Sequence, residues 1–339
     1  MTRGGKATSF DIAELAGVSQ PTVSRALRGD STVSEATRLR VRAVAQQLHY
    51  TVDKNASALR RGRSNTLALL FFEDPLPNRS LINPFFLAML GSMLRTCAER
   101  GYDLLTSFQR MDSDWQAEWE DSRKADGLIL LGHGDFEQYR ERLDGLVRRG
   151  THFVRWGSPD AAADGITVGC DNLAGGRAAG ERLLALGRRR LVFLGEASDS
   201  YPEFRDRDAG LRQAIAAAPG GAIVARADAI STEEAGETAA QRLLASGVAF
   251  DGLFAASDLI ALGALRALAA AGLRVPDDVA VIGFDDIPAA SSSSPPLTTV
   301  AQDYARAGEV LVETLIALLD AQPTADVLLP PRLVLRGTA

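Results

Sequence analysis

Residues 19–25, SQPTVSR, bring hydroxyl, amide and guanidinium groups together at the start of a short amphipathic stretch. Ser19 is a residue type preferred at the N-terminal cap of a helix, and Pro21 is tolerated in a first turn. A helix that starts here turns its apolar side chains inward and leaves a polar face outward. The outward residues are expected to be Gln20, Pro21, Thr22, Ser24 and Arg25. Such groups hydrogen-bond phosphate oxygens and base edges, so this face is a candidate reader of nucleic acid.

Catalytic chemistry finds little support elsewhere in the chain. The histidines His49, His133 and His152 lack the spacing of a zinc site, and no GxSxG, Walker or GxGxxG motif is present. Asp285 and Asp286 follow an apolar run and resemble a pair of catalytic acids, but no nucleophile accompanies them. We therefore expect a protein that is not an enzyme and that uses no metal or cofactor.

Charge is divided unevenly along the 339 residues, whose formal net charge is −6. Residues 1–63 contain 11 lysines and arginines against 5 aspartates and glutamates, a net +6. The remaining 276 residues contain 26 against 38, a net −12. A basic segment on an acidic body favours a polyanionic partner at that segment alone.

Three helices are expected in residues 1–52, which we assign as one all-α domain. Thr8 is suited to cap the first helix, Gly17 to end it, and Ser34 to start the third. The expected inward side chains are Ile12, Leu15 and Ala16, then Val23, Ala26 and Leu27, then Leu39, Val41, Val44, Ala45 and Leu48. Two helices joined by a glycine turn are typical of the helix-turn-helix, whose second helix enters the major groove. A generic three-helix bundle would show the same caps.

A short alanine-rich stretch, residues 53–64, follows as an expected hinge. Its helix would be marginal in water because nucleation outweighs so few hydrogen bonds, and Leu59 would have no core to enter. A segment that becomes helical on DNA, with Leu59 wedged between base pairs and basic residues beside it, accounts for both features.

From residue 65 onward, short apolar runs alternate with amphipathic helical stretches. This pattern predicts doubly wound parallel sheets covered on both faces. The strands fall into two sets, about 66–165 and 190–285, so two similar α/β lobes are expected, with the last strands crossing between them. Ligands of open parallel sheets bind beyond the carboxyl ends of the strands, which places a binding cleft between the lobes.

Residues 8–66 resemble the DNA-binding head and hinge of the LacI/GalR family of bacterial transcriptional regulators. The shared pattern is AGVSxxTVSRxLxG, then VSxxTRxRVxxxxxxLxY. The body resembles the family's two-lobed, periplasmic-binding-protein-like core in NPFF at 83–86, DNLAGGRAAG within 171–195, STEEAGETA at 231–239 and VPDDVAVIGFDD within 275–303. The expected fold is thus α/β, with an all-α helix-turn-helix head, a hinge helix and a core at 65–339.

The resemblance implies roles for individual positions in the head. Those matching Gln20, Pro21 and Arg25 read the major groove, and those matching Ala56 and Leu59 enter the minor groove. The positions that hold phosphates match Thr8, Ser19, Thr22, Ser34 and Thr37. Val52 and Ser57 depart from the family pattern in the hinge, where a proline and an arginine-containing motif are common.

The resemblance also implies a ligand set in the cleft. Arg207 matches an arginine that contacts effector, and Asp285 matches an acid that accepts hydroxyls. The further candidates are Phe86, Asp135, Trp156 and Asp258. Trp156 offers a ring face in place of the aromatic residue that is common where Ser231 stands. A buried core tryptophan is the alternative for Trp156, and helix core is the alternative for Phe86.

The expected function is a sequence-specific DNA-binding regulator, a repressor of carbohydrate-utilisation genes, with a mono- or oligosaccharide effector. We expect a homodimer on a pseudo-palindromic operator, and no tetramer because the final segment lacks a heptad repeat. A cytoplasmic location follows from the absence of an apolar signal core or membrane-length apolar run. The alternatives are a cytosolic sugar-binding module without regulatory DNA binding and a nucleobase-responsive regulator.

Overall fold

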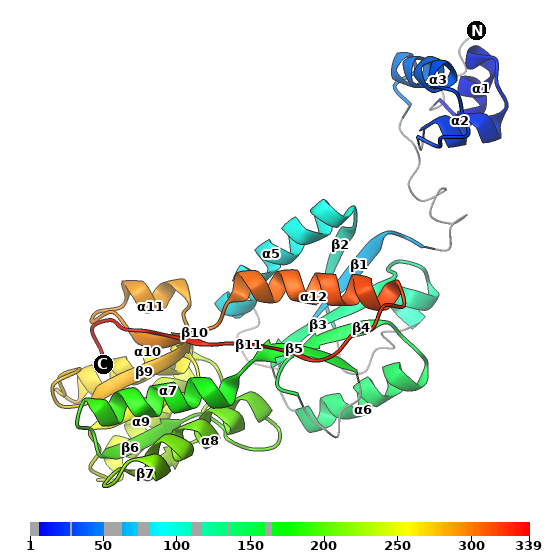
Figure 1. Ribbon diagram of the computed structural model, residues 1–339. Helices are drawn as coiled ribbons and strands as arrows, with labels where there is room; N and C mark the ends of the chain where they lie inside the picture. The colour runs from blue at the N-terminus through cyan, green and yellow to red at the C-terminus, as the bar shows by residue number, and fades with distance from the viewer. Residues whose placement is uncertain are drawn as a thin grey trace. The chain divides into compact units, whose positions relative to one another are not determined.

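The computed structural model describes residues 7–27, 29–50, 63–73, 82–109, 117–133, 136–159 and 165–339. The chain divides into two compact units, Met1–Ser64 and Asn65–Ala339, which are called the head and the core below (Figure 1). Most of the expected hinge, including Ala56 and Leu59, lies outside the described residues, and so does Asp135.

The head consists of the three expected helices, α1 (Ser9–Ala16), α2 (Gln20–Leu27) and α3 (Glu35–Gln47). Thr8 and Asp11 form a reciprocal capping box at the start of α1, and Gly17 ends that helix at φ +64°. Ser34 caps α3 by accepting a hydrogen bond from the backbone N–H of Thr37. The small core contains Ile12, Ala16, Val23, Ala26, Val33, Val41 and Ala45.

Two expected core residues of the head are on its surface. Leu15 is 60% exposed and Leu39 is 59% exposed, so both predictions were wrong. On a helix with 100° per residue, Ala13 and Ala16 lie on one side of Ile12 and Leu15 on the other, and the α1 core face includes Ala13. Leu39 lies almost opposite Val41 on α3, so it cannot share the buried face.

The N-terminal lobe of the core is built on a six-stranded sheet in the order β11-β5-β4-β3-β1-β2. All of its strand pairs are parallel. The strands are β1 (Thr66–Glu73), β2 (Asp103–Phe108), β3 (Gly127–His133), β4 (Phe153–Trp156), β5 (Ile166–Cys170) and β11 (Val327–Leu329). A single π-helical turn, η1 (Ala117–Asp121), precedes β3.

Alternate residues of β1 and β3 face opposite layers of this lobe. Leu69 and Ile129 belong to the cluster beneath α5 (Pro84–Arg100) and α12 (Tyr304–Leu319), which pack together (Figure 1). Leu70 and Leu130 belong to a separate cluster that includes Leu143 of α6 (Phe136–Arg148). Both faces of the sheet are therefore covered, as the apolar runs predicted.

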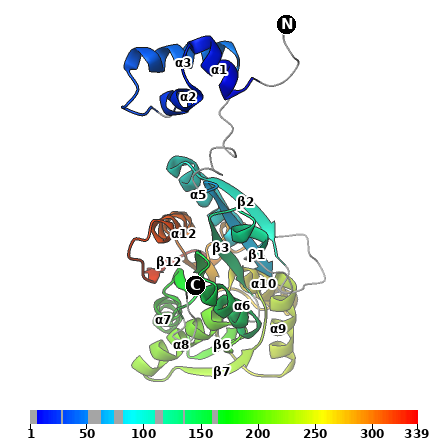
Figure 2. The same ribbon diagram turned by 90° about the vertical axis from the view of Figure 1, so that its right-hand side faces the viewer.

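The C-terminal lobe repeats this plan with the strand order β12-β10-β9-β8-β6-β7. The strands are β6 (Arg190–Leu194), β7 (Ala222–Ala227), β8 (Gly252–Ala255), β9 (Ala280–Asp285), β10 (Thr298–Ala301) and β12 (Arg332–Val334). The helices are α7 (Asn172–Ala185), α8 (Pro202–Ala217), α9 (Glu233–Ala245), α10 (Asp258–Ala270) and α11 (Pro288–Ser292). Helices α7 and α8 pack as one pair and α9 and α10 as another, on opposite sides of the sheet (Figure 2).

The chain crosses between the two lobes three times. It leaves the N-terminal lobe between β5 and α7, returns between β10 and α12, and leaves again between β11 and β12. The pairing of β12 with β10 is also the only antiparallel strand pairing in the described part of the core. The crossings place the carboxyl ends of β4, β6, β8 and β9 along the junction of the lobes. Within the described residues, no helix has both the length and the apolar character needed to cross a membrane.

Candidate DNA-binding face and effector cleft

The outward face of α2 carries the expected polar residues. Ser19, Pro21 and Arg25 are exposed, whereas Gln20, Thr22 and Ser24 are half-buried. The Gln20 amide donates a hydrogen bond to Ser9 Oγ at 3.2 Å, so α1 holds this side chain at one edge of the face. Arg25 Nε donates to the Pro21 carbonyl at 3.5 Å, and the exposed side chains of this face are accessible to a ligand.

Two pairs of hydroxyl groups stand where helices begin. Ser19 Oγ and Thr22 Oγ1 are 2.8 Å apart at the start of α2, and Ser34 Oγ and Thr37 Oγ1 are 2.9 Å apart at the start of α3. Thr8 Oγ1 lies at the start of α1, where it donates to Asp11. All five hydroxyls lie beside backbone N–H groups at positive helix ends, which is an arrangement that suits phosphate oxygens.

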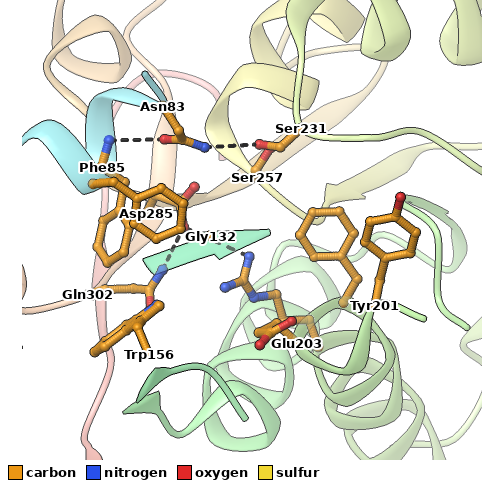
Figure 3. Close-up of a pocket in the computed structure, with 13 residues that line it drawn as sticks. Asn83, Phe85, Gly132, Trp156, Tyr201, Glu203, Ser231, Ser257, Asp285 and Gln302 are labelled. Carbon is orange, nitrogen blue, oxygen red and sulfur yellow. Dashed lines mark hydrogen bonds and ion pairs between the residues drawn. The ribbon is translucent and has the colours of Figure 1, made fainter. Parts of the chain in front are cut away.

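A cleft lies between the lobes of the core, at the ends of several strands of the two sheets (Figure 3). Its floor and walls combine aromatic rings with amide, hydroxyl, carboxylate and guanidinium groups. The lining residues are Asn83, Phe85, Phe86, Gly132, Trp156, Tyr201, Glu203, Phe204, Arg207, Ser231, Ser257, Asp285 and Gln302.

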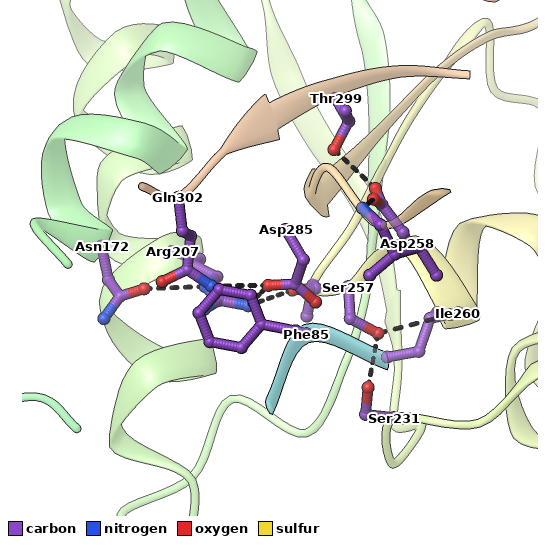
Figure 4. A network of polar contacts seen from close by, with 12 residues as sticks. Phe85, Asn172, Arg207, Ser231, Ser257, Asp258, Ile260, Asp285, Thr299 and Gln302 are labelled. Carbon is purple, nitrogen blue, oxygen red and sulfur yellow. Dashed lines mark hydrogen bonds and ion pairs between the residues drawn. The ribbon is translucent and has the colours of Figure 1, made fainter. Parts of the chain in front are cut away.

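Arg207 of α8 is the only arginine among the cleft-lining residues and is 5% exposed. Its Nε donates to Asn172 Oδ1 at 2.8 Å, and its Nη1 donates to the carbonyl oxygen of Ala256 (Figure 4). The guanidinium lies 3.7 Å from the centre of the Phe284 ring. These contacts hold the guanidinium in one orientation, 3.8 Å from Asp285 Oδ1.

Asp285 ends β9 in an unusual backbone conformation. Its φ is +117° and that of Asp286 is +59°, and residues other than glycine adopt such values at a cost. Gln302 Nε2 donates to Asp285 Oδ1 at 2.6 Å, and Arg336 pairs with Asp286 at 2.6 Å. Burial raises the pKa of Asp285 to about 6, although the Arg207 charge and the Gln302 hydrogen bond lower it. The carboxylate is therefore a held hydrogen-bond acceptor inside the cleft.

Asp258 is not among the residues that line the cleft. It is fully buried at the start of α10, where Oδ2 accepts from the backbone N–H of Ile287 and Oδ1 from the Thr299 hydroxyl (Figure 4). Burial raises its pKa well above the usual range, and the charge of Asp285 raises it further. The side chain braces the turn that follows Asp285, so its position supports a role in holding that turn.

Aromatic rings line both lobes of the cleft. Phe85, which precedes Phe86 in α5, lies 5.6 Å from Trp156 between ring centres. Tyr201 and Phe204, at the start of α8, stack at 6.1 Å. Trp156 is 9% exposed and Phe86 is 4% exposed, so each both packs in the core and borders the cleft.

Comparisons with known proteins match both units of the chain. A model of bacterial regulatory proteins of the lacI family matches residues 10–53, and one of periplasmic binding protein-like domains matches residues 181–339. The transcriptional regulator CelR of Thermobifida fusca is 32% identical over 343 residues, which cover 99% of this chain and 97% of CelR. This chain belongs to the lacI family.

Other members of the lacI family support the assignment. The ribose operon repressor of Escherichia coli K12 is 32% identical over 98% of this chain and all of its own. A solved CelR–cellobiose complex matches 98% of this chain and 100% of its own with a TM-score of 0.72 and 29% identity. A lac repressor dimer bound to operator and an anti-inducer matches 98% of this chain and 99% of its own with a TM-score of 0.82 and 26% identity.

Sequence reasoning missed several residues that border the cleft of this lacI-family chain. Asn83 begins the NPFF motif and Gln302 lies in the matched segment 275–303, so both had a signal. Tyr201, Glu203 and Phe204 surround the start of α8, where the preceding loop shows no periodicity. The structure thus brings Phe86, Trp156, Arg207 and Asp285 together and adds a second group of residues on α8.

Proposed function

We propose that this chain is a sequence-specific DNA-binding repressor of carbohydrate-utilisation genes and that a mono- or oligosaccharide bound in the cleft controls it. The observation that carries this proposal is the presence, in one chain, of a polar α2 face and a cleft with a held arginine–carboxylate pair beside aromatic rings. The lacI-family relatives with matching length are regulators, which favours this function over that of an enzyme.

A homodimer on a pseudo-palindromic operator is part of the proposal, since one small head makes too few contacts for specificity. Leu87 and Leu94 on α5 are 54% and 47% exposed, and Leu105 and Phe108 on the edge strand β2 are also exposed. A second copy packed on these side chains would bury them. The lac repressor structure to which the chain is similar is a dimer, which supports the same assembly.

Sugar recognition follows from the chemistry of the cleft. Asp285 supplies a carboxylate acceptor, and Arg207 and Gln302 supply donors beside it. Sugar hydroxyls both donate and accept, and the less polar faces of a sugar ring pack on aromatic rings such as those of Phe85 and Trp156. CelR binds cellobiose in a solved complex, which supports the same class of ligand for this chain.

A nucleobase effector is the second candidate. The cleft contains Phe85, Phe86, Trp156, Tyr201 and Phe204, and a purine stacks readily between such rings. The position of Ser231, which stands where an aromatic residue is common in the family, favours the sugar.

The DNA-binding half is tested by fluorescence anisotropy with the full chain. The duplexes are pseudo-palindromic sequences from the DNA upstream of the protein's own gene. Their affinities are compared with those of shuffled duplexes between 50 and 200 mM salt. We expect specific binding whose affinity falls steeply, by about 10³-fold or more, because Lys and Arg contacts release counterions. Equal, weak affinity for both duplexes at every salt concentration would instead support a sugar-binding module without regulatory DNA binding.

The effector half is tested by titration calorimetry with cellobiose, maltose, glucose and ribose, and with guanine and hypoxanthine. Binding of a glucoside or a short maltose-type sugar, with a change in operator affinity, is the expected result. Coupling of about 1–3 kcal/mol between the two ligands is typical of such regulators. Tight binding of a purine without heat from any sugar would replace the sugar by the nucleobase.

A further inference from the structure

A hydrogen-bonded chain connects Arg207 to the opposite lobe. Asn172, the first residue of α7, accepts from Arg207 Nε through Oδ1 at 2.8 Å and donates from Nδ2 to Ser158 Oγ at 3.0 Å. Asn172 is 3% exposed and Ser158 is 1% exposed. Ser158 follows β4 in the N-terminal lobe, whereas α7 and α8 belong to the C-terminal lobe.

The orientation of the Asn172 amide decides what Arg207 meets. A carboxamide offers an acceptor at one end and two donors at the other, and a guanidinium has donors alone. With Nδ2 directed at the Ser158 hydroxyl, the oxygen is presented to Arg207 (Figure 4 shows the Asn172–Arg207 contact). In the reversed orientation an NH₂ group would face the buried guanidinium and leave donors on both sides unsatisfied, so Arg207 sets the orientation of the amide. The Ser158 hydroxyl can donate or accept, and its bond to Nδ2 anchors the amide in place.

Ser158 is in turn held by both lobes. Its backbone N–H donates to Glu203 Oε1 of α8 at 3.0 Å, and its carbonyl oxygen accepts from Arg155 Nη2 of β4 at 3.1 Å. A Cβ at the preceding Gly157 would lie 2.9 Å from Glu203 Oε1 and 3.0 Å from Arg155 Nη1, so glycine permits this close approach. Glu203 also borders the cleft.

We propose that Asn172 and Ser158 are positioning residues that make the orientation of Arg207 depend on contact between the lobes. Separation of the lobes breaks two bonds together, from Ser158 to Glu203 and from Asn172 to Ser158. The Asn172 amide then loses Ser158, which anchors its Nδ2 end, so the acceptor of Arg207 Nε is free to move while Nη1 keeps the Ala256 carbonyl. Effector binding and lobe closure are thereby coupled through one amide group; this step rests on the proposed function, in which Arg207 contacts the effector.

The first experiment needs no effector. Hydrogen exchange of the Arg207 Nε–H is measured by NMR in the full-length protein labelled with ¹⁵N-arginine, with Arg207→Lys to assign the signal. We expect exchange at least about tenfold faster in Ser158→Ala and near the wild-type rate in Ser158→Thr, which keeps the hydroxyl. Glu203→Ala should also accelerate exchange, because it removes the bond across the lobes.

Asn172→Asp provides the decisive background. An aspartate here forms a charge-assisted bond with the Arg207 guanidinium, and this stronger bond anchors the side chain without help from Ser158. Ser158→Ala should therefore have no further effect in the Asn172→Asp protein. An equal acceleration in both backgrounds, or none in the wild-type background, would overturn the proposal and leave Ser158 with a packing role alone.

A second measurement uses cellobiose as the probe in titration calorimetry. We expect Ser158→Ala to weaken cellobiose binding about tenfold, in line with the loss of one buried hydrogen bond. Ser246→Ala, which removes a hydroxyl bound to the Leu243 carbonyl far from the cleft, should leave it unchanged. If wild-type protein bound no sugar, the proposed effector class would fail, while the exchange measurement would still decide the role of Asn172.

Discussion

Arg207 and Asp285 are held so firmly that few of their atoms can adjust to a ligand. The guanidinium is fixed by Asn172, the Ala256 carbonyl and the Phe284 ring, and the carboxylate by Gln302. A pair preorganised in this way binds hydroxyl groups without paying again for side-chain ordering. We therefore expect these two residues to dominate recognition at the scale of single side chains.

Replacement of Arg207 tests this directly. Arg207→Ala should weaken cellobiose binding at least about 100-fold and abolish the effect of sugar on operator binding, because it leaves buried acceptors unpaired. Operator affinity without sugar should stay within about twofold of wild type, since the head is a separate unit. Arg205→Ala is the matched control, because Arg205 is half-buried on the same helix, pairs with Asp199 and does not line the cleft. Calorimetry and anisotropy give the two readouts; an undiminished sugar response would exclude Arg207 from the site.

Asp285 should make the free energy of unfolding depend on pH. Burial raises the pKa of this carboxyl from 3.8 to about 6. The folded protein then keeps a proton that the unfolded chain has released, so the free energy of unfolding falls as pH rises from about 4 to 6. The shift corresponds to about 3 kcal/mol. Asp285→Asn should flatten this part of the profile in urea unfolding at pH 4, 5, 6 and 7, whereas parallel profiles would contradict the assigned shift.

The positions of single residues were predicted well only where a sequence motif of the family includes them. Arg207 matches a family arginine and lies on α8, Asp285 matches a family acid at the end of β9, and both border the cleft. Asp258 also follows a strand, yet it turns toward Ile287 and Thr299, and a strand-end position alone does not specify this direction. Tyr201 and Glu203 escaped prediction because the loop before α8 has no repeating pattern.

At the scale of elements, paired glycines bring helices into close contact. A Cβ at Gly176 of α7 would overlap the Arg207 carbonyl, and one at Gly210 of α8 would overlap the Leu173 carbonyl. Gly236 and Gly263 play the same part between α9 and α10. The glycines on α7 and α8 thus place the backbone that carries Arg207.

Gly210→Ala should push α8 away from α7. We expect a loss of about 1–3 kcal/mol in the free energy of unfolding, because the added methyl group overpacks a backbone contact. Gly145→Ala on α6 is the control: its Cβ would meet nothing within 4 Å, so this variant should be unchanged or more stable by about 0.5–1 kcal/mol. Urea titrations measure the free energy of unfolding of both variants. Equal values for Gly210→Ala and Gly145→Ala would show that α7 and α8 can move apart without a loss of stability.

The hinge at 53–64 is predicted from the sequence, and it lies mostly outside the residues that the structure describes. Leu59→Ala should weaken specific operator binding about tenfold or more while sparing the fold of the core, because it removes the side chain expected to wedge between base pairs. Anisotropy with specific and shuffled duplexes measures the difference. Operator affinity equal to that of the wild type would show that Leu59 does not enter the DNA.

Elements were predicted to the extent that they are long or periodic. Alternating apolar runs and helical stretches predicted two parallel, doubly wound lobes, and the structure confirms them. β11 and β12 have three residues each, which is too few for a periodic signal. The sequence therefore predicted only that the last strands cross between the lobes. Leu39 was misplaced because its apolar character was given more weight than its angle on α3.

At the scale of the whole molecule, the proposed dimer depends on exposed apolar side chains of the N-terminal lobe. Small-angle scattering at micromolar concentration should give the mass of two chains. The double variant Leu87→Glu and Leu94→Glu should reduce it to one and weaken operator binding. Leu186→Glu, on a leucine that is 38% exposed at the end of α7, should leave the mass unchanged. A wild-type mass near four chains would rule out the dimer.

The three lobe crossings also affect how this protein folds while the ribosome is still synthesising it. The sheet of the N-terminal lobe receives β11, and its outer layer receives α12, only after the entire run from β6 to β10 has been translated. The first lobe to emerge must therefore wait with an open sheet edge and with one face covered by α5 but not by α12 while the second is made. Nascent chains stalled after Cys170 should expose this apolar face to chaperones, and release from chaperones should follow the appearance of α12 and β11.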